Sequence, residues 1–309
     1  AADPTCIANR ANQHVLYPSH ALYAPGNVFA SVGVQATNGV SNYNSLQASL
    51  TKRLSYGLTF LASYTWSHSI DDTSGYENAS AGYRGINPFN FASYRGDSSF
   101  DARQRFVFSY DYELPRINGL GKNAFVRGLV DGWHVAGITT LQTGFPITVA
   151  DTGFRSLSCD SYTYYGCPDA PNNVAPVQTY DPRTSSLVNT TRNPANTTAL
   201  PYYWFNPNGF ALEPIGTMGN EGRNNFHGPG INNTDLSFSK RFYYRTEDQT
   251  RFLELRLEGY NVFNHTQFSS IPVANLGNGV YSDINSGNFG QVLSAAPGRT
   301  IQLGAKLYF

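Results

Sequence analysis

A strict alternation of apolar and polar residues over long runs is the feature that most constrains this chain. In one run Phe106, Phe108 and Tyr110 share one side, while Ser109 and Asp111 share the other. A period of two residues is the mark of a β-strand with two different faces. Strands of globular proteins have about five or six residues, whereas a strand that crosses a bilayer needs about nine to eleven. Period and length together therefore favour membrane-spanning strands.

The alternation predicts seven such strands. They lie at about residues 43–54, 56–68, 103–115, 133–149, 233–245, 251–264 and 299–309. Residues 28–36 also alternate and are a candidate eighth strand or part of an extracellular hairpin arm. Bacterial single-chain barrels have an even number of strands. We therefore expect either a complete eight-stranded barrel or the C-terminal part of a larger one.

The predicted connections are short at one end of the strands and long at the other. Residues 54–57 and 246–250 are tight turns, and the long links span about 70–102, 150–231 and 268–298. Short periplasmic turns and long extracellular loops are typical of outer-membrane barrels. The fold prediction is thus all-β, with antiparallel transmembrane barrel strands over residues 43–309. Residues 1–42 are predicted to form an extracellular loop or hairpin arm.

Composition narrows the function classes. Lys and Arg number 21 and Asp and Glu number 21, so the net charge is zero, which argues against a nucleic-acid-binding protein. Only 14% of the residues are charged, and another 14% are aromatic. A secreted β-sandwich or solenoid would also alternate, but the polar second faces of the long strands would be costly in a dry sandwich core. We therefore prefer the membrane barrel.

Charged residues lie on the polar faces of the last three predicted strands. They are Arg241, Glu254, Arg256, Glu258 and Lys306. In a barrel they would face the lumen, where they could grip a plug or guide a solute. The alternative, which we favour, is simple cross-strand pairing of opposite charges.

Two aromatic clusters lie in the longest predicted loop. The candidate ligand- or partner-binding residues are Tyr164, Tyr165, Tyr202, Tyr203, Trp204 and Phe205. Amphipathic rings are good anchors for a sugar, a peptide or a protein partner. The alternative is that they pack the loop onto itself, and the sequence does not separate these two roles.

The cysteines and the acidic loop residues suggest no catalytic site. Cys159 and Cys167 are close enough in sequence to form a small disulfide, which leaves Cys6 over. Asp71 and Asp72 are best explained as part of a solvated acidic loop, because regular calcium-ligand spacing is missing. We find no catalytic, metal-binding or cofactor-binding motif, and we expect the protein not to be an enzyme.

The chain ends on an alternating apolar strand with a terminal aromatic residue. Leu303, Ala305, Leu307 and Phe309 occupy every second position. This pattern predicts a C-terminal signal that is read by the barrel assembly machinery.

Several stretches together resemble a known family. They lie at residues 41–47, 61–72, 100–106, 132–133, 143–146, 219–224, 228–230 and 258–265. From about residue 40 to its end, the chain is similar to TonB-dependent-receptor-like outer-membrane proteins of the Oar-like type. These proteins have a carboxypeptidase-regulatory-like N-terminal domain. The resemblance implies a large plugged barrel of which this chain is the C-terminal part.

The resemblance also implies a function and a set of partners. The expected function is ligand capture by extracellular loops and uptake through a plugged lumen in the bacterial outer membrane. Expected partners are the lipid bilayer, the missing N-terminal barrel and plug or another chain that completes the sheet, and a TonB-type energising protein. The alternatives are a self-assembling β-rich subunit at the cell surface and a complete small barrel.

Overall fold

The computed structural model describes most of the predicted strands. It describes residues 39–72, 74, 92, 95–115, 126, 130–153, 155, 169–243, 251–268 and 279–309. The candidate strand 28–36, the turn 246–250, the three cysteines and the tyrosines 164 and 165 lie outside these residues. No helix among the described residues is long and apolar enough to cross a bilayer.

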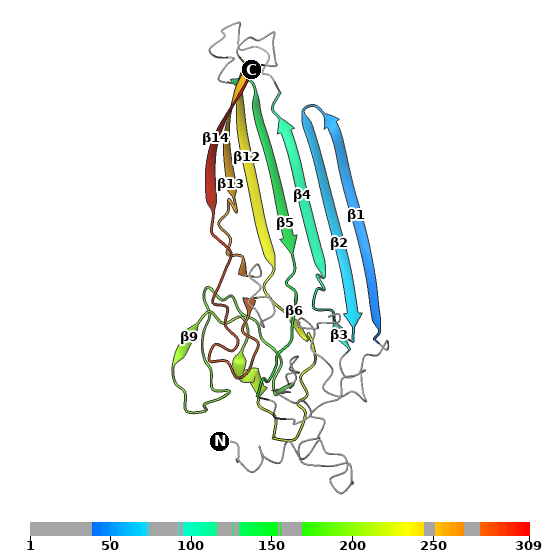
Figure 1. Cartoon of the computed structure of the whole chain (residues 1–309), viewed down its shortest axis with the longest axis vertical. Coiled ribbons are helices and arrows are strands. Elements are labelled where there is room, and N and C mark those ends of the chain that lie inside the picture. The colour runs from blue at the N-terminus through cyan, green and yellow to red at the C-terminus, as the bar shows by residue number, and fades with distance from the viewer. Residues whose placement is uncertain are drawn as a thin grey trace, which may run out of the picture.

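Seven long antiparallel strands form one sheet, as Figure 1 shows. They are β1 (Ser41–Ser55), β2 (Leu58–Asp71), β4 (Gln104–Glu113), β5 (Trp133–Gln142), β12 (Ile231–Tyr243), β13 (Phe252–Tyr260) and β14 (Thr300–Tyr308). Their order in space is their order in the chain, and the short β3 (Gly96–Asp97) pairs with β2. All seven predicted strands are present, so the predicted antiparallel fold class is confirmed.

The connections separate into two ends, as predicted. The β1–β2 turn and the C-terminus lie at one end, and the long links from β2 to β4, β5 to β12 and β13 to β14 gather at the other (Figure 1). The β1–β2 turn places Tyr56 at a φ of 54° and Gly57 at a φ of 76°. Two consecutive positive φ angles match the twist of a tight hairpin, for which glycine is well suited.

The register places apolar residues on the same face of every long strand. One row runs Leu50, Ala62 and Phe108, and another runs Phe238, Leu257 and Leu303. Serine, threonine and charged residues occupy most of the opposite face, with Leu61 and Ile138 among the apolar exceptions. We refer to these as the apolar face and the polar face. Because a shift by one residue would exchange them, the two faces fix the register.

Two predicted strands end earlier than the alternation suggests. The run 133–149 leaves the sheet after Gln142, and Gly144 beyond it lies so close to the backbone of Gly228 that a Cβ atom would collide. Pro146 then begins the separate strand β6 (Pro146–Ile147). The run 251–264 ends at Tyr260, because Asn261 adopts a φ of 50° and its side chain bonds the backbone of His265. Local side-chain bonds of this kind compete with strand pairing.

The long links fold into a second body, the loop cap, which comprises the described residues of 143–230 and 261–299. Its elements are β6 paired with β11 (Phe226–His227), β7 (Asn172–Asn173) paired with β10 (Phe210–Ala211), β8 (Ser186–Val188) paired with β9 (Ala199–Pro201), and the 3-10 turn η2 (Pro207–Gly209). The sequence leaves open whether the longest loop packs onto itself, and the cap does have a hydrophobic core.

The sheet is open. Strand β1 lies at one edge and β14 at the other, and nearly every side chain of both strands is exposed. Long unpaired edges invite pairing with further strands. Within a bilayer, a sheet needs closure so that all backbone groups are hydrogen-bonded. We therefore expect the two edges to be paired in the membrane.

Two leucines with equal exposure test the assignment of the faces. Leu255 lies on the apolar face and Leu61 on the polar face, and each is 43% exposed. We expect Leu255→Arg to destabilise the vesicle-inserted protein by about 2–4 kcal/mol, the cost of a cation on the lipid side of a membrane barrel. Leu61→Arg is the matched control and should cost less than about 1 kcal/mol, as expected for an exposed substitution away from lipid.

The measurement is denaturant unfolding of both variants in lipid vesicles. Equal destabilisation by the two substitutions would contradict the assignment of the apolar face to lipid.

Candidate functional site

Aromatic side chains build the core of the loop cap. Phe205 makes edge-to-face contacts with Phe210, Phe226 and Phe289, with ring centroids 5.2–5.6 Å apart. Aliphatic side chains complete this core, namely Ile147, Val149, Val280, Ile284 and Val292. These residues come from two long links, so the core joins the links into one body. A packed core holds the surface of the cap in a defined shape.

The predicted ligand-binding aromatic residues divide between core and surface. Tyr203 and Phe205 are fully buried, so they pack the cap rather than offer a surface for stacking. Tyr202 is half exposed. Trp204 is partly buried against the core, and its indole N–H donates to the carbonyl of His227 at 3.0 Å. Of the described cluster, Tyr202 and Trp204 thus remain available to a ligand.

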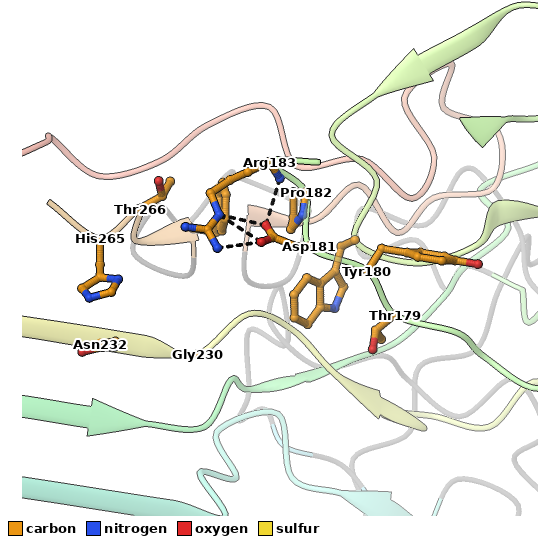
Figure 2. A pocket seen from close by; sticks show the side chains of 11 residues that line it. Thr179, Tyr180, Asp181, Pro182, Arg183, Gly230, Asn232, His265 and Thr266 are labelled. Carbon is orange, nitrogen blue, oxygen red and sulfur yellow. Dashed lines mark hydrogen bonds and ion pairs between the residues drawn. The ribbon is translucent and has the colours of Figure 1, made fainter. Parts of the chain in front are cut away.

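Trp204 lines a pocket between the cap and the ends of β12 and β13. The cavity has a volume of about 390 Å³. Figure 2 shows its lining, which is made by Thr179, Tyr180, Asp181, Pro182, Arg183, Trp204, Gly230, Asn232, His265, Thr266 and Phe268. Aromatic walls with a few polar groups are usual for small-molecule sites. Asn232 shares the face of Leu236 and Phe238, so the pocket lies at the rim of the sheet and not along its polar face.

An exposed ion pair stands on one side of this pocket. The guanidinium of Arg183 donates to the carboxylate of Asp181 at 2.6 and 2.9 Å, as the dashed lines in Figure 2 mark. These bonds lower the pKa of Asp181. The pair presents a charged fork beside Trp204, a combination that suits a polar ligand with one flat apolar side.

A buried ionic network anchors the cap to the sheet. The guanidinium of Arg223 donates to the carboxylate of Asp71, and its second nitrogen donates to Ser74 at 2.9 Å. Both side chains of the pair are only 4% exposed. Asp71 continues the row of Ser67 and Ser69, so the anchor lies at the end of the polar face. The sequence suggested a solvated acidic loop here, which is wrong for Asp71 because Arg223 covers it.

A second cluster joins the end of β2 to β3 and β4. Arg103 donates to Asp101 at 2.6 Å and to Asp97 at 2.7 Å, and it also contacts His68. The imidazole of His227 lies 3.6 Å from Asp97, and burial lowers the pKa of His227. Arg103 therefore forms an ion pair with each of the two carboxylates.

A third group of carboxylates lies inside the cap. Carboxylate oxygens of Asp151, Asp169 and Glu213 come within 4.8 Å of one another, and all three residues are buried. Burial raises the pKa of Glu213 to about 8, and the neighbouring charges of Asp151 and Asp169 add to this effect. The three residues lie far apart in the sequence, so no local motif marks them.

The comparison with known families decides the class of the protein. A family model described as an outer membrane beta barrel domain matches residues 3–302. The chain belongs to this outer-membrane β-barrel family. Searches of curated proteins and of solved structures give no significant match. The predicted location in the outer membrane is therefore confirmed, and the cap corresponds to the extracellular end of the barrel.

The predicted lumenal charges form a cross-strand ladder in this outer-membrane barrel protein. Arg241 bonds Glu254 at 3.0 Å, and Arg256 bonds Glu254 at 2.5 Å and Glu258 at 3.5 Å. Lys306 lies opposite Glu254 in the register, with its ammonium 4.7 Å from the ring of Tyr308. The charges share the polar face, so their mutual pairing offsets much of the cost of their burial.

The residues of the predicted assembly signal lie on the exposed edge strand. Leu303, Leu307 and Phe309 are exposed, and Ala305 lies between them on the same face. Phe252 stacks on Tyr308 with ring centroids 4.3 Å apart, and Tyr243 contacts Phe252. These rings share the polar face with Glu254 and Lys306 at the end that carries the C-terminus, so they belong to the lumenal side and not to the lipid-facing aromatic girdle. Recognition of this edge by the assembly machinery stays a prediction.

The buried pair of Arg223 with Asp71 and the exposed pair of Arg183 with Asp181 can be compared directly. We expect Arg223→Met to destabilise the attachment of the cap by about 3–5 kcal/mol, because it leaves the buried Asp71 carboxylate without its cation. Arg183→Met is the control, since the side chains of that pair are 58% and 40% exposed. Water solvates its partner, so the control should leave stability nearly unchanged.

Limited proteolysis of the cap in the detergent-solubilised protein measures this difference. The account of the anchor fails if both variants are cleaved at the rate of the unmodified protein. It also fails if Arg183→Met opens the cap as much as Arg223→Met.

Proposed function

We propose that this protein is the C-terminal part of a TonB-dependent-receptor-like outer-membrane transporter. In this proposal the loop cap captures a ligand from outside, and the ligand passes through a lumen lined by the polar face. A plug domain fills the lumen and moves under the force of a TonB-type energising protein. The proposed role is binding and transport, without catalysis.

The observation that carries the proposal is a folded cap fixed to one end of a two-faced sheet. The cap has its own core, and Arg223 ties it to Asp71 at the end of the polar face. A pocket with Trp204 and the Arg183 fork lies at the rim. A barrel that served only as a structural element would not need such an ordered recognition surface. The stretches that resemble Oar-like receptors also include Asp71 and Arg223 of the anchor and Asp101 and Arg103 of the second cluster.

The polar face supports passage of a solute. Arg241, Glu254, Arg256 and Glu258 pair with one another along β12 and β13, so this part of the lining has its charges matched. Such a lining tolerates contact with a polar plug or a hydrated solute. In the proposal, the rest of the barrel and the plug come from further strands of the same polypeptide or from another chain. These strands would pair with β1 and β14.

Uptake by living cells tests the transport role. Radiolabelled peptides, oligosaccharides and ferric chelates are supplied to cells that make the full-length protein and to cells that lack it. We expect one class to enter only when the energising protein is present. Trp204→Ala should lower that uptake about 10-fold at limiting ligand, the effect of losing one large anchor side chain. Tyr56→Ala, at the far end of the sheet, is the control and should change nothing.

Two outcomes would contradict the proposal. One is uptake that continues unchanged when the energising protein is deleted. The other is uptake of none of the three classes above the level of cells that lack the protein.

A self-assembling surface subunit is the second candidate function, and the two exposed edge strands favour it. If copies pair edge to edge, β1 of one copy lies beside β14 of another. In a background without native cysteines, Ser49→Cys and Gln302→Cys place thiols on the polar faces of these two strands. We expect no disulfide-linked ladder of copies in the outer membrane, since the receptor proposal pairs each edge within one barrel. A regular ladder of oligomers would favour self-assembly instead.

A further inference from the structure

The three ionic clusters described above differ in how their carboxylates are paired. Arg223 forms an ion pair with Asp71, and Arg103 forms ion pairs with both Asp97 and Asp101. Asp151 and Glu213 form no ion pair with any Lys or Arg among the described residues. Arg155 does approach Glu213, but it donates to the backbone carbonyl at 2.7 Å and not to the carboxylate. Arg192 likewise donates to the backbone carbonyl of Asn285.

The carboxylate of Glu213 is buried, and no donor among the described residues bonds to it. Its residue is 0% exposed, and neither of its carboxylate oxygens has a hydrogen-bond partner among the described residues. A buried polar group without a partner is costly, and a buried carboxylate without one is costlier still. Such a group indicates that something else occupies the space in front of it.

Asp151 presents one oxygen to the same space. Its Oδ1 atom accepts from the backbone N–H of Gly153 at 2.6 Å and from the side-chain amide of Asn285. Its Oδ2 atom is buried and has no hydrogen-bond partner in the described part of the chain. The side chain is therefore held by one oxygen, while the other is buried without a hydrogen-bond partner among the described residues.

The backbone holds the three carboxylates in fixed positions. Asp151 and Asp169 exchange two backbone hydrogen bonds, of 2.7 and 2.8 Å. Arg155 fixes the segment of Glu213 through its carbonyl, and Gly216 donates to the carbonyl of Arg155 at 2.7 Å. Ile284 donates to Ala150 at 2.9 Å, which adds the last long link to the same framework. The site is thus built by segments that only the folded cap brings together.

The geometry points to a Ca²⁺ site formed by Asp151, Asp169 and Glu213. Two oxygens that bind one Ca²⁺ at about 2.4 Å each lie at most about 4.8 Å apart, a span that the ligand oxygens of this cluster meet. Hard carboxylate oxygens are the ligands that Ca²⁺ prefers. Ca²⁺ is favoured over Mg²⁺, because Mg²⁺ gives up water reluctantly and the three residues are 0–2% exposed.

The bound ion would join three segments of the longest extracellular link, and Asp151 is in turn hydrogen-bonded to Asn285 of the last long link. Removing Ca²⁺ would leave the carboxyl groups of the cluster without a cation and would favour opening of the cap. The inference concerns the stability of the cap and does not depend on the transport proposal.

Calcium titration of the full chain in detergent micelles tests the site. The protein is first freed of divalent ions with a chelator, and CaCl₂ or MgCl₂ is then added. Calorimetry measures the heat of ion binding, and limited proteolysis measures how often the cap opens. We expect one Ca²⁺ per chain. At a calcium concentration 100 times the Kd, the opened cap should be about 100-fold less populated, with cleavage slowed accordingly.

Substitutions of the ligands provide the decisive comparison. Glu213→Gln removes one charge with little change of shape, so the cap should stay closed without calcium and lose its response to it. Asp169→Asn tests the same claim from a second ligand, so that a folding defect in one variant does not decide the result. Asp101→Asn is the matched control, since it removes a buried carboxylate that forms an ion pair with Arg103, and its calcium response should persist.

Three results would overturn the inference. They are the absence of calcium binding by the unmodified protein, a full calcium response in both Glu213→Gln and Asp169→Asn, and equal protection of the cap by Mg²⁺.

Discussion

Backbone hydrogen bonding in a medium without water is the constraint on which the rest of this structure depends. Lipid offers no partner to N–H and C=O groups, so strands that cross it must pair on both sides. The seven long strands meet this demand between β1 and β14 through continuous antiparallel pairing. The pairing in turn gives the sheet its two faces, because its register places Leu50, Phe108 and Leu303 on one side. Chemically different faces allow the sheet to separate lipid from a polar interior.

In the extracellular cap, buried polar and charged side chains also need partners. Its links are too long to remain irregular in a compact fold, and they bury an aromatic core around Phe205. Burial then requires partners for the charges that come with the links. Arg223 and Arg103 meet this requirement where the cap joins the sheet, and we infer that Ca²⁺ meets it at Glu213. The ionic clusters thus fix the cap, while the pocket beside Trp204 remains open to ligand.

The sequence predicted the sheet well and the cap poorly, for a physical reason. Alternation is a local signal, so the strand and the face of residues such as Phe106 and Phe108 can be predicted from their neighbours in the sequence alone. Alternation predicted the strand ends less well. Beyond these ends, Gly144 lies against the backbone of Gly228, and Asn261 bonds the backbone of His265. The ion pair of Asp71 with Arg223 and the cluster around Glu213 join residues that are far apart in the sequence. Only the assembled cap brings these residues together, so spacing could not reveal them.

Lipid contact along single strands tests the central claim most directly. Spin labels are placed one at a time at successive positions of β4 and β13 in the vesicle-inserted protein, and their collisions with oxygen and with a water-soluble nickel chelate are measured. The account predicts that oxygen contact, which reports lipid, rises at every second label, with maxima at Phe108 and Leu255. It predicts nickel contact at the intervening positions. Labels at Phe108 and Leu255 that meet neither reagent would place these residues inside a packed protein core and contradict the account.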